Sequence, residues 1–176
     1  SKALSSDLPQ KTEFKTRFHL LDTIVSILTG RLLPPGKKAF QFSKAQGGVK
    51  ESTLLGSDVK VSAINAGFSN GMAAHANETD DSTTEGRFHP GCAIVPATLA
   101  VAEREKLGSK EIIKAIALGY DVGVRITTSL GYKTPKTSIF ATHSIGPIFG
   151  CAASAGALLK LTHEQCNYLL SYTVQQ

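Results

Sequence analysis

The sequence predicts an all-α fold, with several antiparallel helices around one layered core. Apolar residues recur every three or four positions in several stretches, glycine or proline separates these stretches, and no segment alternates convincingly as a strand does. The chain has 176 residues, of which 41% are hydrophobic and 19% are charged. This length suits one domain and this composition excludes intrinsic disorder, so we expect residues 1–176 to contain no internal domain boundary.

The first expected helix covers residues 11–30 and carries a continuous apolar stripe. The stripe residues are spaced by 4, 3, 4 and 3 positions, which places them on one helical face. We expect this face to be buried. The stripe consists of Phe14, Phe18, Leu21, Val25 and Leu28.

Further along the chain, a shorter helix is expected over residues 37–45 and a short extended piece over 51–56. Residues 58–77 are rich in alanine, glycine, serine and asparagine and are expected to form a second long helix. Four more helices are expected, over about residues 90–106, 110–131, 144–160 and from 163 onward. In the helix over 110–131, Gly119 and Gly123 lie four positions apart and permit close approach of another helix.

Charge and cysteine usage narrow the possible partners and the compartment. Nineteen basic and 14 acidic residues give a net charge of +5, but the basic residues form no dense run. We therefore expect no nucleic-acid partner, and the apolar runs are too short for a membrane span.

The three cysteines, Cys92, Cys151 and Cys166, lack a CxxC pair and are expected to be buried free thiols. Such thiols indicate a reducing compartment, the cytoplasm or, in a eukaryote, the mitochondrial matrix.

Most polar residues that could perform chemistry lie in one segment, residues 75–91, with the sequence HANETDDSTTEGRFHPG. His75, Glu78 and Asp81 are spaced by three, so a continued helix would place them on one face. Asp80, Glu85, Arg87 and His89 follow in the same segment. The density of carboxylates and histidines makes it the first candidate for a functional site.

Two histidines lie where helices are expected to begin. His89 precedes Pro90, which favours an extended backbone before a helix, and His143 precedes another predicted helix. A helix N-terminus attracts anions and disfavours imidazolium, so these histidines suit removal of a proton next to a carboxylate. Two other interpretations stay open: the histidines and aspartates only cap helices and turns, or His75, His89 and one aspartate bind a metal ion.

Five segments in order resemble the MmgE/PrpD family. They are FHLLDTIVSILTG at 18–30, NAGFSNGMAAHANETDDS at 65–82, HPGCAIVPATLAVAE at 89–103, AIALGYDVGVRI at 115–126 and ATHSIGPIFGCAASAGALLKLTHEQ at 141–165. The acidic segment followed by His-Pro-Gly is the most specific of these. The resemblance implies that residues 1–176 are the N-terminal part of a larger helical domain, whose α/β lid and active-site lysines follow Gln176.

The resemblance also implies an activity. It implies a cofactor-free lyase, a dehydratase or decarboxylase, that acts as a homodimer on a small polycarboxylic acid such as 2-methylcitrate or cis-aconitate. The alternatives are an isomerase or epimerase on the same scaffold, or a non-catalytic helical binding or assembly module. No metal is expected, and residues 1–176 alone are expected to be inactive.

Site residues are implied by position within the matching segments. Glu78 stands where several relatives have aspartate and Ser82 where many have threonine, and these departures concern the substrate rather than the class. The expected catalytic residues are His89, His143 and Asp81, and the expected substrate-binding residues are Glu78, Asp80, Ser82 and Arg87.

Overall fold

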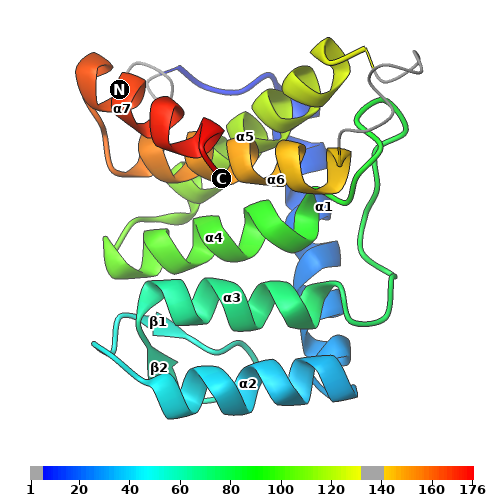
Figure 1. Cartoon of the computed structure of the whole chain (residues 1–176), viewed down its shortest axis with the longest axis vertical. Coiled ribbons are helices and arrows are strands. Elements are labelled where there is room, and N and C mark those ends of the chain that lie inside the picture. Colours follow the sequence, from blue (N-terminus) through cyan, green and yellow to red (C-terminus); the bar gives the residue numbers. More distant parts are fainter. Residues whose placement is uncertain (1–5, 132–140) are drawn as a thin grey trace.

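The computed structural model describes residues 6–131 and 141–176, and most of these residues are helical (Figure 1). The helices are α1 (Gln10–Gly30), α2 (Pro34–Gln46), α3 (Ala63–Ala74), α4 (Gly91–Arg104), α5 (Ser109–Ser129), α6 (Thr142–Leu158) and α7 (His163–Val174). Two short strands, β1 (Ser52–Thr53) and β2 (Lys60–Val61), pair antiparallel. The predicted all-α class is therefore confirmed.

Figure 1 shows α2, α3, α4 and α6 stacked one above another, with α1 running across the stack. α1 contacts α3, α4 and α5, and α5 packs along α6. The buried apolar side chains belong to several elements and include Ile27 on α1, Ile94 on α4 and Ile116 on α5. None of the described helices combines the length and hydropathy that a bilayer span requires.

Glycines allow α5 and α6 to cross closely. A Cβ atom on Gly119 would lie 2.9 Å from the carbonyl oxygen of Gly150, and one on Gly123 would lie 2.8 Å from that of Gly146. Since nonbonded Cβ atoms do not approach other atoms this closely, a side chain at these positions would push the helices apart. The close packing predicted for Gly119 and Gly123 is confirmed.

α3 is shorter than the predicted helix over 58–77. Residues 60–61 pair with β1, and the helix begins only after Ser62, whose hydroxyl accepts a hydrogen bond from the Asn65 amide. At the other end α3 stops at Ala74, and Glu78 has a left-handed backbone with φ of 57°. The prediction that His75, Glu78 and Asp81 share one helical face was wrong, because these residues lie in a loop. α2 is longer than predicted because prolines occupy its first turn, where no amide donor is needed.

The apolar stripe of α1 is exposed in the described structure, contrary to the prediction. Its five side chains are between 42% and 61% exposed. The opposite face is buried instead, and its two threonine hydroxyls donate hydrogen bonds within the helix: Thr23 Oγ1 to the His19 carbonyl at 2.9 Å and Thr16 Oγ1 to that of Thr12 at 2.8 Å. The buried residues are Thr16, Thr23, Ser26, Ile27 and Gly30.

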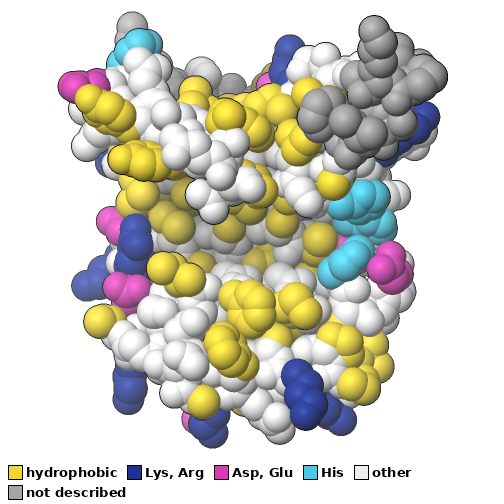
Figure 2. Space-filling view, in the orientation of Figure 1, with side chains coloured by type: hydrophobic (Ala, Val, Ile, Leu, Met, Phe, Trp, Pro, Cys, Tyr) yellow, Lys and Arg dark blue, Asp and Glu magenta, His cyan; other side chains and the backbone are white. Residues whose placement is uncertain are grey.

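A second group of exposed apolar side chains lies on α3. Figure 2 shows hydrophobic side chains gathered over this helix, and the exposed ones on α3 are Ile64, Phe68 and Met72. Phe42 of α2 lies beside Phe68, with ring centroids 5.7 Å apart. Apolar side chains are thus exposed on both α1 and α3 in the described structure.

Candidate active site

The loop between α3 and α4 is held in place by Phe88. This side chain is 1% exposed and its ring fits against Gly146, where an added Cβ would lie 2.6 Å from the ring. Thr83 and Phe88 form an isolated β-bridge, and the Thr142 hydroxyl at the start of α6 donates to the Arg87 carbonyl at 2.6 Å. These contacts give His89, the next residue, a defined position between α4 and α6.

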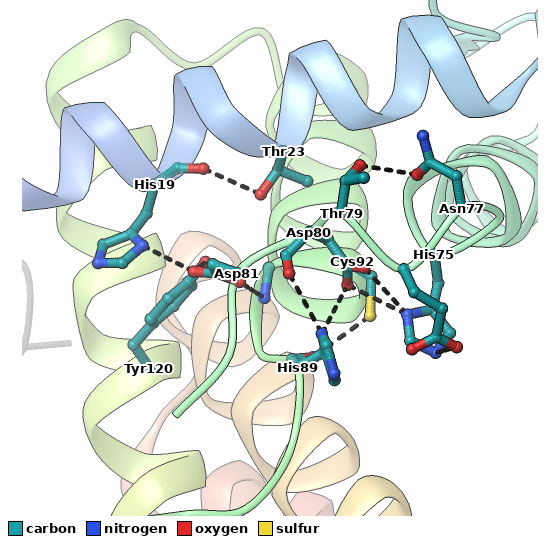
Figure 3. Close-up of polar contacts among 12 residues, drawn as sticks. His19, Thr23, His75, Asn77, Thr79, Asp80, Asp81, His89, Cys92 and Tyr120 are labelled. Carbon is teal, nitrogen blue, oxygen red and sulfur yellow. Dashed lines mark hydrogen bonds and ion pairs between the residues drawn. The ribbon is translucent and has the colours of Figure 1, made fainter. Parts of the chain in front are cut away.

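Asp80 is the centre of the polar cluster on this loop (Figure 3). Its side chain is 0% exposed. His75 Nδ1 lies 3.1 and 3.2 Å from the two carboxylate oxygens, and His89 Nδ1 lies 3.5 Å from Oδ2. His89 Nδ1 also lies 3.3 Å from the Asp80 carbonyl oxygen. Because both groups that face His89 Nδ1 are acceptors, we infer that this nitrogen carries the proton and that Nε2 keeps its lone pair.

Three histidines from three parts of the fold meet here. The ring centroids of His75 and His89 are 5.0 Å apart, and those of His89 and His143 are 6.1 Å apart. His75 follows the end of α3 and His89 precedes α4, whereas His143 lies inside the first turn of α6 rather than before it. Figure 2 shows histidine side chains together at the surface, beside an acidic side chain.

The expected substrate-binding residues occupy different environments. Glu78 is exposed, and its Oε1 lies 3.3 Å from His75 Nε2 at the edge of the cluster. Ser82 and Arg87 are exposed on the same loop, and the backbone of Arg87 is left-handed with φ of 52°. The Asp80 carboxylate contacts His75 and His89 and has no exposed surface. It therefore faces the two histidines and not the solvent, unlike Glu78, Ser82 and Arg87.

Asp81 faces away from the cluster and joins three helices (Figure 3). Its carboxylate accepts hydrogen bonds from the Gly91 amide of α4 at 2.8 Å and from the Tyr120 hydroxyl of α5 at 2.9 Å. His19 Nδ1 of α1 lies 2.7 Å from the same carboxylate. A Cβ on Gly91 would lie 2.5 Å from Asp81 Oδ1, so this contact requires glycine. The first amide of α4, expected to attract a substrate anion, is thus occupied by Asp81.

His19 and Tyr120 were not among the candidate residues from the sequence. They lie far from the loop in the sequence, and although both fall in segments that resemble the family, nothing in their spacing pairs them with Asp81. The hydrogen bond to Asp81 raises the pKa of His19 despite partial burial, which acts in the opposite direction. Burial, and then the charge of Asp81, raise the pKa of Tyr120, so its hydroxyl stays a donor.

The cysteines near the site are neutral. The Cys92 thiol lies 3.3 Å from the His89 carbonyl oxygen, and burial, with a further contribution from Asp80, raises its pKa. Burial raises the pKa of Cys151 to about 12. All three cysteines are free, as predicted, and each is partly rather than fully buried. A neutral thiol is a poor nucleophile, so neither Cys92 nor Cys151 is placed as a nucleophile beside the cluster.

The fold and the cluster define a helical domain with a histidine–carboxylate site in an interhelical loop. The chain belongs to the MmgE/PrpD family, because the MmgE/PrpD N-terminal domain matches residues 2–176. It is 28% identical to cis-aconitate decarboxylase of Homo sapiens over 160 residues, which cover 88% of this chain and 33% of that protein. It is also 28% identical to cis-aconitate decarboxylase of Mus musculus over 142 residues, 78% of this chain and 29% of that protein. The chain therefore spans about a third of the length of these relatives.

Proposed function

We propose that this chain carries the proton-transfer site of a lyase that removes water or carbon dioxide from a small polycarboxylic acid, in the class of 2-methylcitrate or cis-aconitate. The observation that carries the proposal is the contact between the buried Asp80 and His89 Nδ1. Membership of the MmgE/PrpD family and the relation to cis-aconitate decarboxylases support the class of reaction.

His89 is the proposed base. With the Nδ1 proton held by the two Asp80 acceptors, His89 Nε2 presents its lone pair to a substrate. In a dehydration, it takes the proton from the carbon next to a carboxylate. The positive charge that His89 acquires is stabilised by the Asp80 carboxylate, which is the role of the aspartate in other carboxylate–histidine pairs.

His143 is the proposed partner in proton transfer. Its ring neighbours that of His89, with the centroids 6.1 Å apart, so one small substrate at the surface of the cluster can contact both rings. In a dehydration, a ring N–H group of His143 gives its proton to the departing hydroxyl group, and water leaves. In a decarboxylation, the carbon–carboxylate bond breaks, carbon dioxide leaves, and the same proton goes to the substrate carbon that receives the electron pair. Arg87 and Glu78, exposed on the loop, are proposed to contact the polar groups of the substrate.

The proposal is tested in the full-length protein with His89→Asn. Asparagine keeps a donor for Asp80 but has no basic nitrogen, so we expect kcat to fall roughly 10²–10⁴-fold, the usual contribution of a general acid or base. The matched control is His163→Asn, an exposed histidine at the start of α7, which should keep full activity. Full activity of a well-folded His89→Asn variant would sink the assignment.

A second test separates this mechanism from a metal-dependent one. Extensive chelation with EDTA should leave turnover undiminished, because no step uses a metal ion. Product analysis decides between dehydration, with loss of water, and decarboxylation, with loss of carbon dioxide. Loss of activity on chelation, restored by one divalent metal, would favour catalysis by a metal bound to the histidines; a product of unchanged formula would identify an isomerase.

A further inference from the structure

Three side chains of the loop bring metal-binding atoms together in one place. His75, Asp80 and His89 each offer one such atom, and these atoms lie within 4.8 Å of one another. His75 Nδ1 lies 3.2 Å and His89 Nδ1 lies 3.5 Å from the same carboxylate oxygen, Asp80 Oδ2. Two imidazoles and one carboxylate form a donor set that divalent transition metals prefer over Mg²⁺ or Ca²⁺.

The distances need little change to accept an ion. Zn²⁺ bonds of about 2.0–2.2 Å to nitrogen and oxygen in tetrahedral geometry place neighbouring ligand atoms roughly 3–3.5 Å apart. The contacts from Asp80 to each histidine already match this range, so only the two imidazoles have to approach each other. His75 can make that movement, because it follows the last residue of α3 and its side chain is 40% exposed.

The charge of Asp80 adds a second argument. Its carboxylate is fully buried, and both ion-pair partners that the described structure gives it are histidines. When both histidines are neutral, only hydrogen bonds stabilise the buried negative charge of Asp80. A buried carboxylate without a positively charged partner has a higher free energy than one in an ion pair. A divalent cation between the three groups would supply the missing positive charge. The partly exposed rings of His75 and His89 give it a path from solvent.

We propose that a divalent transition metal ion, with Zn²⁺ as the reference case, binds His75, Asp80 and His89 and inhibits the enzyme. The inhibitory part rests on the proposed function of His89. Coordination through His89 Nδ1 requires the lone pair on that nitrogen, so the proton of the neutral ring moves to Nε2. Nε2 then has no lone pair to accept a proton from a substrate. The metal-bound form and the general-base form of His89 are therefore mutually exclusive.

The test uses the full-length protein and Zn²⁺ itself, in calorimetric titrations of protein previously treated with a chelator and dialysed. We expect one Zn²⁺ per chain at the site, with affinity at least about tenfold weaker in His75→Gln, since even the loss of a residue that only supports a ligand costs 10–100-fold. His163→Gln, the matched control on α7, should bind as the unaltered protein does. Equal affinity in His75→Gln and His163→Gln would overturn the site, as would the absence of binding.

Two further variants keep the test decisive. His89→Gln removes a different ligand and should weaken Zn²⁺ binding as His75→Gln does, which guards against misfolding of one variant. Cys92→Ser should bind Zn²⁺ normally, because the proposed ligand set does not include this thiol. Retention of secondary structure by circular dichroism accompanies each titration. Loss of binding in Cys92→Ser would contradict the assigned ligands.

Inhibition is measured separately as the fraction of each protein's own turnover that remains with added Zn²⁺. Unaltered protein should lose turnover over the same Zn²⁺ range in which the site fills, and EDTA should restore it. Zn²⁺ binding that leaves turnover unchanged would overturn the inhibitory role. A protein that binds Zn²⁺ at this site but converts no carboxylic acid would disprove the proposed function instead, and an active enzyme that does not bind Zn²⁺ would disprove only the metal site.

Discussion

The Tyr120 hydroxyl on α5 donates a hydrogen bond of 2.9 Å to Asp81, 39 residues earlier in the chain. Asp81 is the neighbour of Asp80, and the two carboxylates point to opposite sides of the loop (Figure 3). Asp81 is bound to α1, α4 and α5, so its position determines where Asp80 meets His75 and His89. The contacts of Asp81, which include neither His75 nor His89, thus fix the position of Asp80, the central carboxylate of the histidine cluster.

Removing this hydroxyl should destabilise the fold. In Tyr120→Phe, the Asp81 carboxylate loses a neutral donor in a largely buried setting, and hydrogen bonds to charged groups contribute about 1.5–3 kcal/mol. We expect the free energy of unfolding, measured with urea, to fall by about that amount. Tyr172→Phe is the matched control, because Tyr172 is 65% exposed and should change stability by less than about 0.5 kcal/mol. Equal losses in both variants would show that the contact with Asp81 contributes nothing.

The ion pair of His19 with Asp81 should make stability depend on pH. Asp81 raises the pKa of His19 above its ordinary value of 6.5, so the folded state binds this proton more tightly than the unfolded state. The stabilisation is complete below about pH 6.5 and is lost as the pH rises through the raised pKa. The difference in unfolding free energy between the unaltered protein and His19→Gln should therefore be larger at pH 6 than at pH 9.

Tyr120→Phe provides the control for this pH dependence. The pKa of Tyr120 is raised from an already high value, so its hydroxyl stays protonated across the interval from pH 6 to 9. Its contribution to stability should be the same at both ends. A difference for His19→Gln that stays constant, or grows with pH, would contradict the assignment of a charged His19 beside Asp81.

The contact of Phe88 with Gly146 should not tolerate a methyl group. A Cβ at residue 146 would lie 2.6 Å from the Phe88 ring, and overpacking of this kind costs about 1–3 kcal/mol. We expect Gly146→Ala to lower the urea midpoint. Gly67→Ala on α3 is the control, because its Cβ would meet its nearest neighbours at an ordinary 3.9 Å. Alanine there should raise stability by up to about 1 kcal/mol through its better helix propensity. A stable Gly146→Ala variant would mean that Phe88 does not need this space.

The exposed stripe of α1 predicts the behaviour of a polypeptide limited to residues 1–176. With Phe14, Phe18 and Leu21 all more than half exposed, we expect it to bind a hydrophobic dye, to self-associate and to show no lyase activity. Replacing Phe14 and Phe18 with serine should lower dye binding. A monomer that unfolds in one cooperative transition and binds no dye would show that the apolar stripe of α1 does not have to pack against another part of the protein.

The helices were predictable because their signals are local. The spacing of apolar residues and the proline that follows His89 depend only on nearby residues, and so does the capping box that Thr162 and Gln165 form at the start of α7. The prolines of α2 were not recognised as the start of that helix, which begins before the predicted 37–45. His89 could be selected for the same reason, since the proline after it fixes its place before α4. The end of α3 could not be located in this way, because the residues after Ala74 are compatible with continued helix until tertiary contacts turn the chain.

The sequence by itself determined the all-α class and the segment that carries the histidines and carboxylates. Only the tertiary structure decided which of two adjacent aspartates meets the histidines and which face of α1 is buried. Neighbouring residues in a loop point in different directions, and contacts from distant helices, His19 of α1 and Tyr120 of α5, select the direction of Asp81. On α1, the small residues Thr23, Ser26 and Gly30 allow closer approach of α3 and α4 than the bulky stripe does, so helix packing rather than hydrophobicity alone selects the inner face.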